Sequence, residues 1–203
     1  MAVAAPSERN FFAFLGLSRK LNIDAADLEQ RYRALSRQVH PDYFYNAPAA
    51  ERRASLERSS YLNDAYRTLK NAATRIEYLL KLEGAIATGN DGAQSATAAP
   101  PAGLLEEVFA LNEELDEIRE LRAAGAPADQ WKGRLEKARA PIEAKRVNHE
   151  TQLQELSRKW DALLDRNRSD DERRRVLEEL RERFLERNYI NNLLAGIERE
   201  LSS

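Results

Sequence analysis

Cysteine is absent from this 203-residue chain. Its absence excludes disulfides, thiolate zinc sites, cysteine-held clusters and cysteine nucleophiles. Long apolar runs are also absent: no stretch of about 18 consecutive apolar residues occurs, so we predict no membrane-spanning helix and no membrane partner. The first residues lack the apolar core of a secretion signal, and we therefore expect a cytoplasmic protein.

The chain carries no excess of charge of one sign. It has 32 Lys and Arg residues against 34 Asp and Glu residues, for a net charge of -2. Such a balance gives no global attraction to nucleic acid, so we expect no nucleic-acid partner. Any surface that binds through charge must be local.

Glycine is scarce, with only 8 residues, and four of them fall within residues 84–103. The last part of this stretch, GNDGAQSATAAPPAG, contains no large apolar side chain. A segment of this composition buries too little surface to offset the entropy lost on ordering. We therefore predict a linker at 84–103 between a unit at 8–83 and a unit at 104–203.

Alternating strand patterns are missing, whereas apolar residues recur at spacings of three and four. This spacing, with abundant Ala, Leu, Glu and Arg, predicts an all-α protein. The expected helices lie at about 9–16, 24–39, 48–71, 73–83, 104–123, 127–167 and 170–201. The last three form a predicted three-helix bundle.

Pro141 falls inside the long helix predicted at 127–167. A proline removes one backbone hydrogen bond and crowds the preceding turn. The sequence leaves two alternatives open: a kinked helix, or two helices that meet near residue 140.

The helix predicted at 24–39 has an apolar stripe and a basic flank. Arg33, Arg37 and His40 cluster away from the stripe, and Arg31 adds positive charge on another side. On this helix alone, a solvated basic face is the favoured interpretation, and a docking surface is the alternative.

The tripeptide His40-Pro41-Asp42 follows that helix directly. Pro41 ends the helix and biases His40 toward an extended conformation, and Asp42 can accept hydrogen bonds that fix the loop. A catalytic histidine would need a nucleophile or a substrate pocket, and the sequence offers no Gly-rich phosphate loop and no metal-ligand spacing. We therefore expect no enzyme, no cofactor and no metal site.

Three segments of the first unit resemble the J-domain family of co-chaperones: NFFAFLGLS, LEQRYRALSRQVHPDYF and ERSSYLNDAYRTLKN. Members of this family stimulate ATP hydrolysis by DnaK-type heat-shock chaperones. The resemblance implies the same partner here. By this resemblance the chaperone-binding residues are His40, Pro41, Asp42, Arg31, Arg33 and Arg37.

Further segments resemble one J-domain subfamily, the HscB co-chaperones of iron–sulfur cluster assembly. They are ATRIEYLLKLEG, LLEEVFALNEELDEIRE and RNYINNLLAGIEREL. This resemblance implies an HscA-like chaperone partner and an IscU-like scaffold protein as client. The client-binding residues that it implies are Leu105, Phe109, Glu113 and Tyr189. Glu106 and Ala110 depart from the subfamily's pattern, which leaves the client's identity open.

From the residues alone, Leu105 and Phe109 lie beside the apolar seam of their helix. They belong either to a wide core stripe or to an exposed binding patch. Tyr189 is likewise either at the edge of the bundle or on a binding surface. His149 lies on an apolar seam, where a hydrogen-bonded bundle residue is expected rather than a metal ligand.

Three functional hypotheses follow. The first is a co-chaperone that delivers an iron–sulfur scaffold protein to its chaperone. The second keeps the J-domain activity and assigns another client. The third is a non-catalytic helical adaptor in which the His-Pro-Asp corner is inert.

Overall fold

The computed structural model describes residues 10–87, 101–166 and 169–202, and within them the protein is all-α without a strand, as predicted. The predicted linker lies largely outside the described residues. The α-helices are α1 (Phe11–Phe14), α2 (Ala25–Val39), α3 (Ala49–Lys70), α4 (Ala72–Leu82), α5 (Leu105–Ala123), α6 (Ala128–Asp165) and α7 (Asp170–Ser202). Two short 3-10 helices, η2 (Pro41–Phe44) and η4 (Ala102–Leu104), precede α3 and α5.

Side-chain caps set several helix starts. Asp24 accepts the Ala26 N–H at 2.9 Å at the start of α2, and Asn71 accepts the Ala73 N–H at 2.9 Å at the start of α4. Before α7 the Ser169 hydroxyl accepts a backbone N–H at 3.4 Å. Each cap satisfies a donor that has no partner inside its helix, which is why these short polar residues mark helix starts.

Pro141 does not interrupt α6, so the alternative in which the helix splits near residue 140 is wrong. The missing N–H costs one backbone hydrogen bond. Leu135 and Ile142, on either side of the proline, are both buried in one apolar cluster. Their burial stabilises the helix across the break in its hydrogen bonding.

Contacts between residues divide the chain into two units. Unit 1 comprises Met1–Ile86 and Leu156–Leu180, and unit 2 comprises Ala87–Glu155 and Arg181–Ser203. Helices α6 and α7 therefore contribute residues to both units. The unit boundaries predicted at residues 83 and 104 remain a prediction. Each contact-based unit combines two segments that are far apart in the sequence, so it does not test a boundary at one position.

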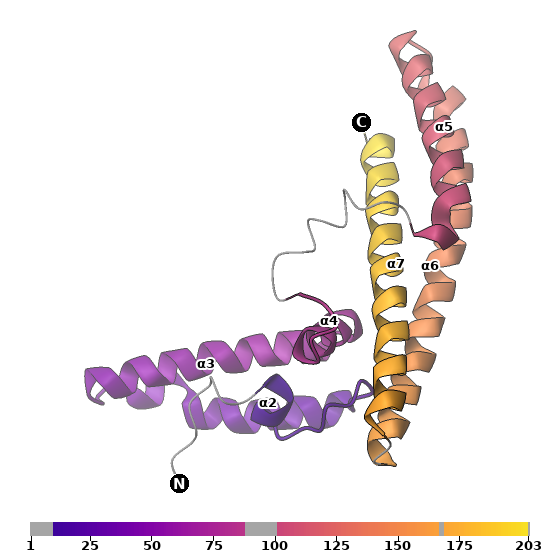
Figure 1. Cartoon of the computed structure of the whole chain (residues 1–203). Coiled ribbons are helices and arrows are strands. Elements are labelled where there is room, and N and C mark those ends of the chain that lie inside the picture. The colour runs from indigo at the N-terminus through magenta and orange to yellow at the C-terminus, as the bar shows by residue number, and fades with distance from the viewer. Residues whose placement is uncertain (1–9, 88–100, 167–168, 203) are drawn as a thin grey trace. The chain divides into compact units, whose positions relative to one another are not determined.

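Unit 1 is built on α2 and α3, which lie side by side (Figure 1). The rings of Tyr32 and Tyr66 stack between them with centroids 4.2 Å apart, and the Tyr32 hydroxyl donates to Asn63 Oδ1 at 2.8 Å. The largest fully buried side chains of unit 1 are Phe12, Leu15, Leu28, Leu62, Leu69, Leu79, Leu80 and Leu180.

Buried polar contacts join the end of α6 to the rest of unit 1. The Asp161 carboxylate accepts the Leu21 N–H at 2.6 Å, the Asn22 N–H at 2.9 Å and the Asn22 side-chain amide at 2.7 Å. The neighbouring Trp160 indole donates to the Arg19 carbonyl at 2.9 Å. Both α6 side chains are less than one tenth exposed. They fix the segment that leads into α2.

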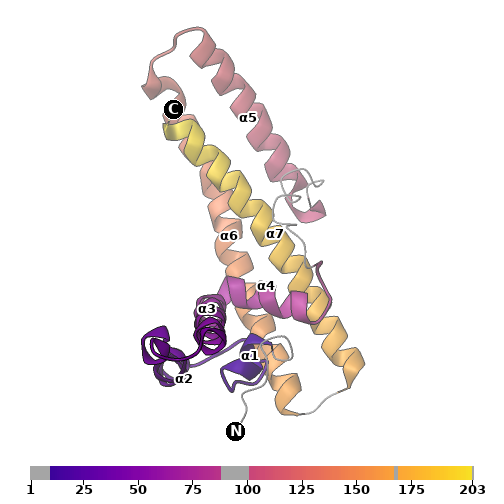
Figure 2. The same ribbon diagram turned by 90° about the vertical axis from the view of Figure 1, so that its left-hand side faces the viewer.

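Unit 2 is a three-helix bundle of α5 with parts of α6 and α7 (Figure 2). Its core is a cluster of buried apolar residues: Leu104, Val108, Leu111, Ile118, Trp131, Leu135, Ile142, Ile190 and Ile197. Beside this core the His149 ring contacts the Lys145 carbonyl at 2.9 Å and Glu186 at 2.8 Å. His149 is thus a hydrogen-bonded residue of the bundle.

Candidate functional site

The tripeptide His40-Pro41-Asp42 forms an exposed corner between α2 and α3. Helix α2 ends at Val39, His40 has extended backbone angles (φ -63°, ψ 129°), and Pro41 begins η2. A proline favours this conformation in the residue before it. The exposed fraction of the side chain is 48% for His40 and 86% for Asp42. The corner therefore lies at the surface of unit 1.

Local hydrogen bonds give the corner its shape. His40 Nδ1 accepts the Asp42 N–H at 3.3 Å, and the Tyr43 N–H donates to the His40 carbonyl at 3.1 Å. A neutral imidazole that accepts at Nδ1 carries its proton on Nε2. The Ser55 hydroxyl donates to the Val39 carbonyl at 2.8 Å and so ties α3 to the end of α2. The corner is held by these bonds rather than by burial.

Two arginines line the exposed flank of α2 one turn apart. Arg33, with 69% of its side chain exposed, pairs with Glu29 at 2.5 Å, and Arg37 is also exposed. These three residues border a surface groove of about 480 Å³. Exposed ion pairs contribute little to stability, so the guanidinium groups can exchange an internal partner for an external one at small cost.

Arg31 lies in a different environment. Its Nε is 2.8 Å and 2.9 Å from the two Asp27 oxygens, and its Nη1 donates to the Gly16 carbonyl at 2.7 Å and the Leu15 carbonyl at 3.3 Å. These contacts hold the end of α1 against α2. A docking role for Arg31 stays a prediction, with less support than the same role for Arg33 and Arg37.

In unit 2, two large apolar side chains of α5 face solvent. Leu105 is 38% exposed and Phe109 is 66% exposed, and Glu113, one turn further, is also exposed. Leu104 and Val108 beside them are buried in the core. The structure thus favours the exposed patch over the wide core stripe, since a phenylalanine this exposed has little role in packing.

Tyr189 of α7 lies at the edge of the bundle. Its side chain is half-buried and packs against the core cluster of unit 2, next to the fully buried Ile190. Packing of this kind leaves part of the ring accessible. Its contribution to client binding stays a prediction.

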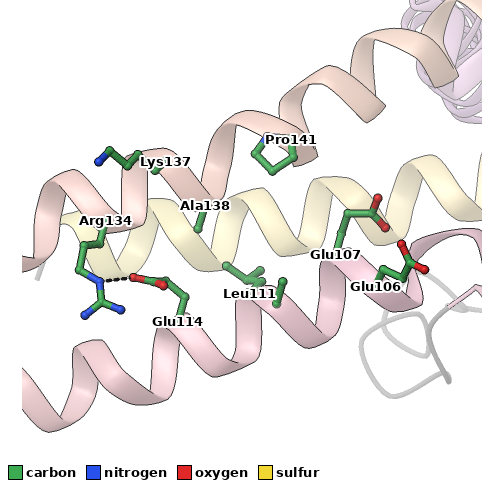
Figure 3. Close-up of a pocket in the computed structure, with 9 residues that line it drawn as sticks. Glu106, Glu107, Leu111, Glu114, Arg134, Lys137, Ala138 and Pro141 are labelled. Atoms are coloured by element: carbon green, nitrogen blue, oxygen red, sulfur yellow. Dashed lines mark hydrogen bonds and ion pairs between the residues drawn. The ribbon is translucent and has the colours of Figure 1, made fainter.

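Glu106 and Ala110 line a groove between α5 and α6 of about 650 Å³ (Figure 3). These are the two positions that depart from the subfamily's pattern. The other lining residues are Glu107, Leu111, Glu114, Arg134, Lys137, Ala138 and Pro141. The groove has an apolar floor between an acidic wall on α5 and a basic wall on α6 (Figure 3).

Ion pairs connect the two walls. Arg134 pairs with Glu114 at 2.5 Å (Figure 3) and with Glu117, and Lys145 pairs with Glu107 at 2.7 Å. The hydrogen bond from Lys145 lowers the pKa of Glu107 below its ordinary value. These pairs bridge α5 and α6 and neutralise three of the five charged side chains that line the groove: Glu107, Glu114 and Arg134.

Sequence reasoning missed two buried charged residues of unit 1, Asp161 and Arg75. The guanidinium of Arg75 donates to the Leu69 carbonyl at 2.7 Å and the Leu21 carbonyl at 2.5 Å, and burial lowers its pKa. The available signal was Asp161 itself, because it falls on the same helical face as Leu164, three residues later. This spacing alone does not separate Asp161 from an exposed carboxylate such as Glu113, which also shares a helix face with apolar residues.

Among residues 10–87, 101–166 and 169–202, no group of three or more His, Asp or Glu side chains is arranged to hold a metal ion. In that same part of the chain, every helix is too short or too polar to cross a bilayer. The site candidates, which rest on the exposure described above, are the corner with its basic flank and the α5 patch.

Comparisons with known proteins match both units. Residues 10–78 match the DnaJ domain family. Over 118 residues the chain is 37% identical to the co-chaperone protein HscB homolog of Aromatoleum aromaticum, a match that covers 58% of this chain and 62% of that protein. The structure is similar to the chaperone HscB from Vibrio cholerae (TM-score 0.59, 25% identity, 96% of this chain and 98% of that one). It is also similar to human co-chaperone HscB (TM-score 0.61, 26% identity, 97% and 84%).

Proposed function

Because this chain belongs to the HscB family of J-domain co-chaperones, we propose that it stimulates ATP hydrolysis by an HscA-like, DnaK-type chaperone and presents an IscU-like scaffold protein to it. In this proposal the ATP and its active site belong to the chaperone, so the protein is not itself an enzyme and uses no cofactor. The iron–sulfur cluster is cargo on the client. We also propose that the protein acts in the cytoplasm.

The exposed corner of unit 1 carries this proposal. His40 and Asp42 stand at the surface in a shape that local bonds fix before any partner arrives. A rigid corner loses little conformational entropy on binding, so more of its contact energy is available to favour one state of the partner. Arg37 and Arg33 lie about one and two turns back along α2 and can attract an acidic chaperone surface.

The exposed patch of unit 2 supports the client half of the proposal. Leu105 and Phe109 present apolar surface next to the carboxylate of Glu113. An apolar centre with a polar rim is typical of protein-binding surfaces. Tyr189 would extend this surface from α7.

A single-turnover ATPase assay with a purified HscA-like chaperone tests the first half. Wild-type protein should raise the hydrolysis rate, and His40→Gln should abolish the increase while its circular dichroism stays that of the wild type. Asp64→Asn, a change at another exposed side chain of unit 1, serves as the control and should retain stimulation. Equal stimulation by wild type and His40→Gln would contradict the proposal and leave the adaptor hypothesis standing.

Calorimetry with the scaffold protein tests the second half. The double variant Leu105→Ala with Phe109→Ala should lower the affinity for the scaffold protein by more than about tenfold. The reason is that central apolar residues of an interface each contribute about 1 kcal/mol or more. Val147→Ala, at an apolar side chain of unit 2 that is 56% exposed, is the matched control and should bind as wild type does. Unchanged affinity in the double variant would place the client site elsewhere.

One observation favours a second candidate, a J-domain co-chaperone with another client. Glu106 and Ala110 border the groove between α5 and α6, so these departures from the subfamily's pattern alter a shaped surface. If wild-type protein stimulates the chaperone but does not bind the scaffold protein, this second candidate replaces the first.

A further inference from the structure

Tyr43 of η2 and Tyr45, the residue directly after η2, are the two most exposed of the large apolar side chains in the part of the chain that the structure describes. Tyr43 is 72% exposed and Tyr45 is 78% exposed, whereas Phe44 between them is half-buried. Phe44 therefore supplies the apolar anchor of this turn. The tyrosine rings have little role in packing, although each exposes apolar surface that would gain free energy on burial.

These rings are continuous with the His-Pro-Asp corner. The Tyr43 N–H donates to the His40 carbonyl at 3.1 Å, and the Tyr45 N–H donates to the Asp42 carbonyl at 3.4 Å. The rings of His40 and Tyr43 lie edge to face with centroids 6.1 Å apart. A protein that covers His40 would therefore also contact the Tyr43 ring, and the backbone of Tyr45 is bonded to the corner at Asp42.

We propose that Tyr43 and Tyr45 form an aromatic extension of the chaperone-docking surface. Their rings pack against apolar side chains within an acidic surface of the same DnaK-type partner. This inference rests on the proposed function, since it takes the occupant of the corner as given. Charge supports the choice of partner surface, because residues 33–53 carry four arginines against only two acidic residues. Tyrosine is enriched at protein interfaces because its ring is large, rigid and polar at its tip.

The roles of the corner and of the tyrosines differ. The corner biases the nucleotide cycle of the partner, whereas the tyrosines add contact area and so strengthen binding. Loss of the rings should therefore change the concentration at which stimulation occurs more than its maximum. Loss of His40 should remove stimulation at every concentration.

A titration in the single-turnover ATPase assay separates these roles. Tyr43→Ser with Tyr45→Ser should raise the half-stimulating concentration at least about tenfold, with a maximal rate at saturation close to that of wild type. Tyr43→Phe with Tyr45→Phe keeps the rings and should retain most of the wild-type affinity. The single variant Tyr45→Ser leaves the Tyr43 ring beside His40 and should still weaken binding, which distinguishes partner contact from support of the imidazole. Val147→Ser, on unit 2, is the control and should behave as wild type.

The outcomes are distinguishable. If wild type stimulates, His40→Gln does not, and the Tyr-to-Ser double variant has the wild-type half-stimulating concentration, this inference is overturned and the proposed function stands. If wild type does not stimulate, both are overturned. Cosedimentation with phosphatidylcholine–phosphatidylserine vesicles that depends on the tyrosines, together with unchanged stimulation, would assign the rings to a lipid surface and also overturn the inference.

Discussion

Asp161→Ala should destabilise unit 1 more than most single substitutions. The Asp161 carboxylate is 8% exposed and accepts three hydrogen bonds, two of them from the backbone N–H groups of Leu21 and Asn22. Alanine removes all three acceptor contacts. The Leu21 amide is buried, so in the variant it has lost its carboxylate acceptor in a place with little access to water.

The magnitude follows from those contacts. Hydrogen bonds to a charged group contribute about 1.5–3 kcal/mol each, and leaving a buried N–H unsatisfied costs about 1–3 kcal/mol. Contributions within one network are not additive, so we expect a loss of about 3–5 kcal/mol in the free energy of unfolding. With a urea slope of about 2 kcal/mol per M, the unfolding midpoint should fall by about 2 M.

Urea unfolding followed by circular dichroism measures the midpoint, and amide hydrogen exchange reports on Leu21 and Asn22 directly. Asp165→Ala, at an exposed carboxylate of the same helix that pairs with Lys20, is the matched control and should leave the midpoint nearly unchanged. A wild-type midpoint for Asp161→Ala, with exchange at both amides as slow as in wild type, would refute the reasoning.

Three further predictions concern unit 1. Gly16→Ala should lower the midpoint of thermal unfolding. Gly16 has φ 68°, which strains an alanine backbone, and an added Cβ would lie 2.9 Å from the Arg31 guanidinium. An unchanged midpoint would show that alanine is not strained at this position. Ser55→Ala removes the 2.8 Å bond to the carbonyl at the end of α2 and should cost about 1 kcal/mol in urea unfolding; a cost near zero would mean that α3 does not support the corner through this bond. Burial raises the pKa of Tyr78, so stability present below pH about 10 should be lost as pH rises through the folded-state pKa. Tyr78→Phe should reduce this alkaline loss in pH-dependent unfolding, whereas Tyr45→Phe should not.

Periodicity was sufficient to locate the helices. The spacing of Leu104, Val108, Leu111, Leu115 and Ile118 predicts a buried seam on α5; four of the five are in the core of unit 2, and Leu115 is partly buried against it. Asp24 is a short polar residue directly before α2, and its side chain caps that helix. Both signals are local, because a helix buries one face and its first turn needs a cap wherever the helix packs.

Only part of the candidate site was predicted from the sequence. The corner at His40 follows from a proline after an amphipathic helix, and the structure has it exposed with His40 extended. The choice between core and patch for Phe109 stayed open, since a helix pattern does not say which flank its neighbours cover. The different surroundings of Arg31 and Arg33 also depend on α1, which lies well before both residues in the chain.

The sequence by itself determined the helical class, the approximate helix bounds, the exposed His-Pro-Asp corner and the absence of cysteine chemistry, because these depend on residue type and on neighbours within a few positions. Only the tertiary structure decided that α6 continues through Pro141 and that Asp161 binds the backbone of Leu21 and Asn22. It also decided that Phe109 faces solvent. Each of these features depends on which segment, distant in the sequence, packs against the residue. The spacing of residues along the chain does not specify that segment.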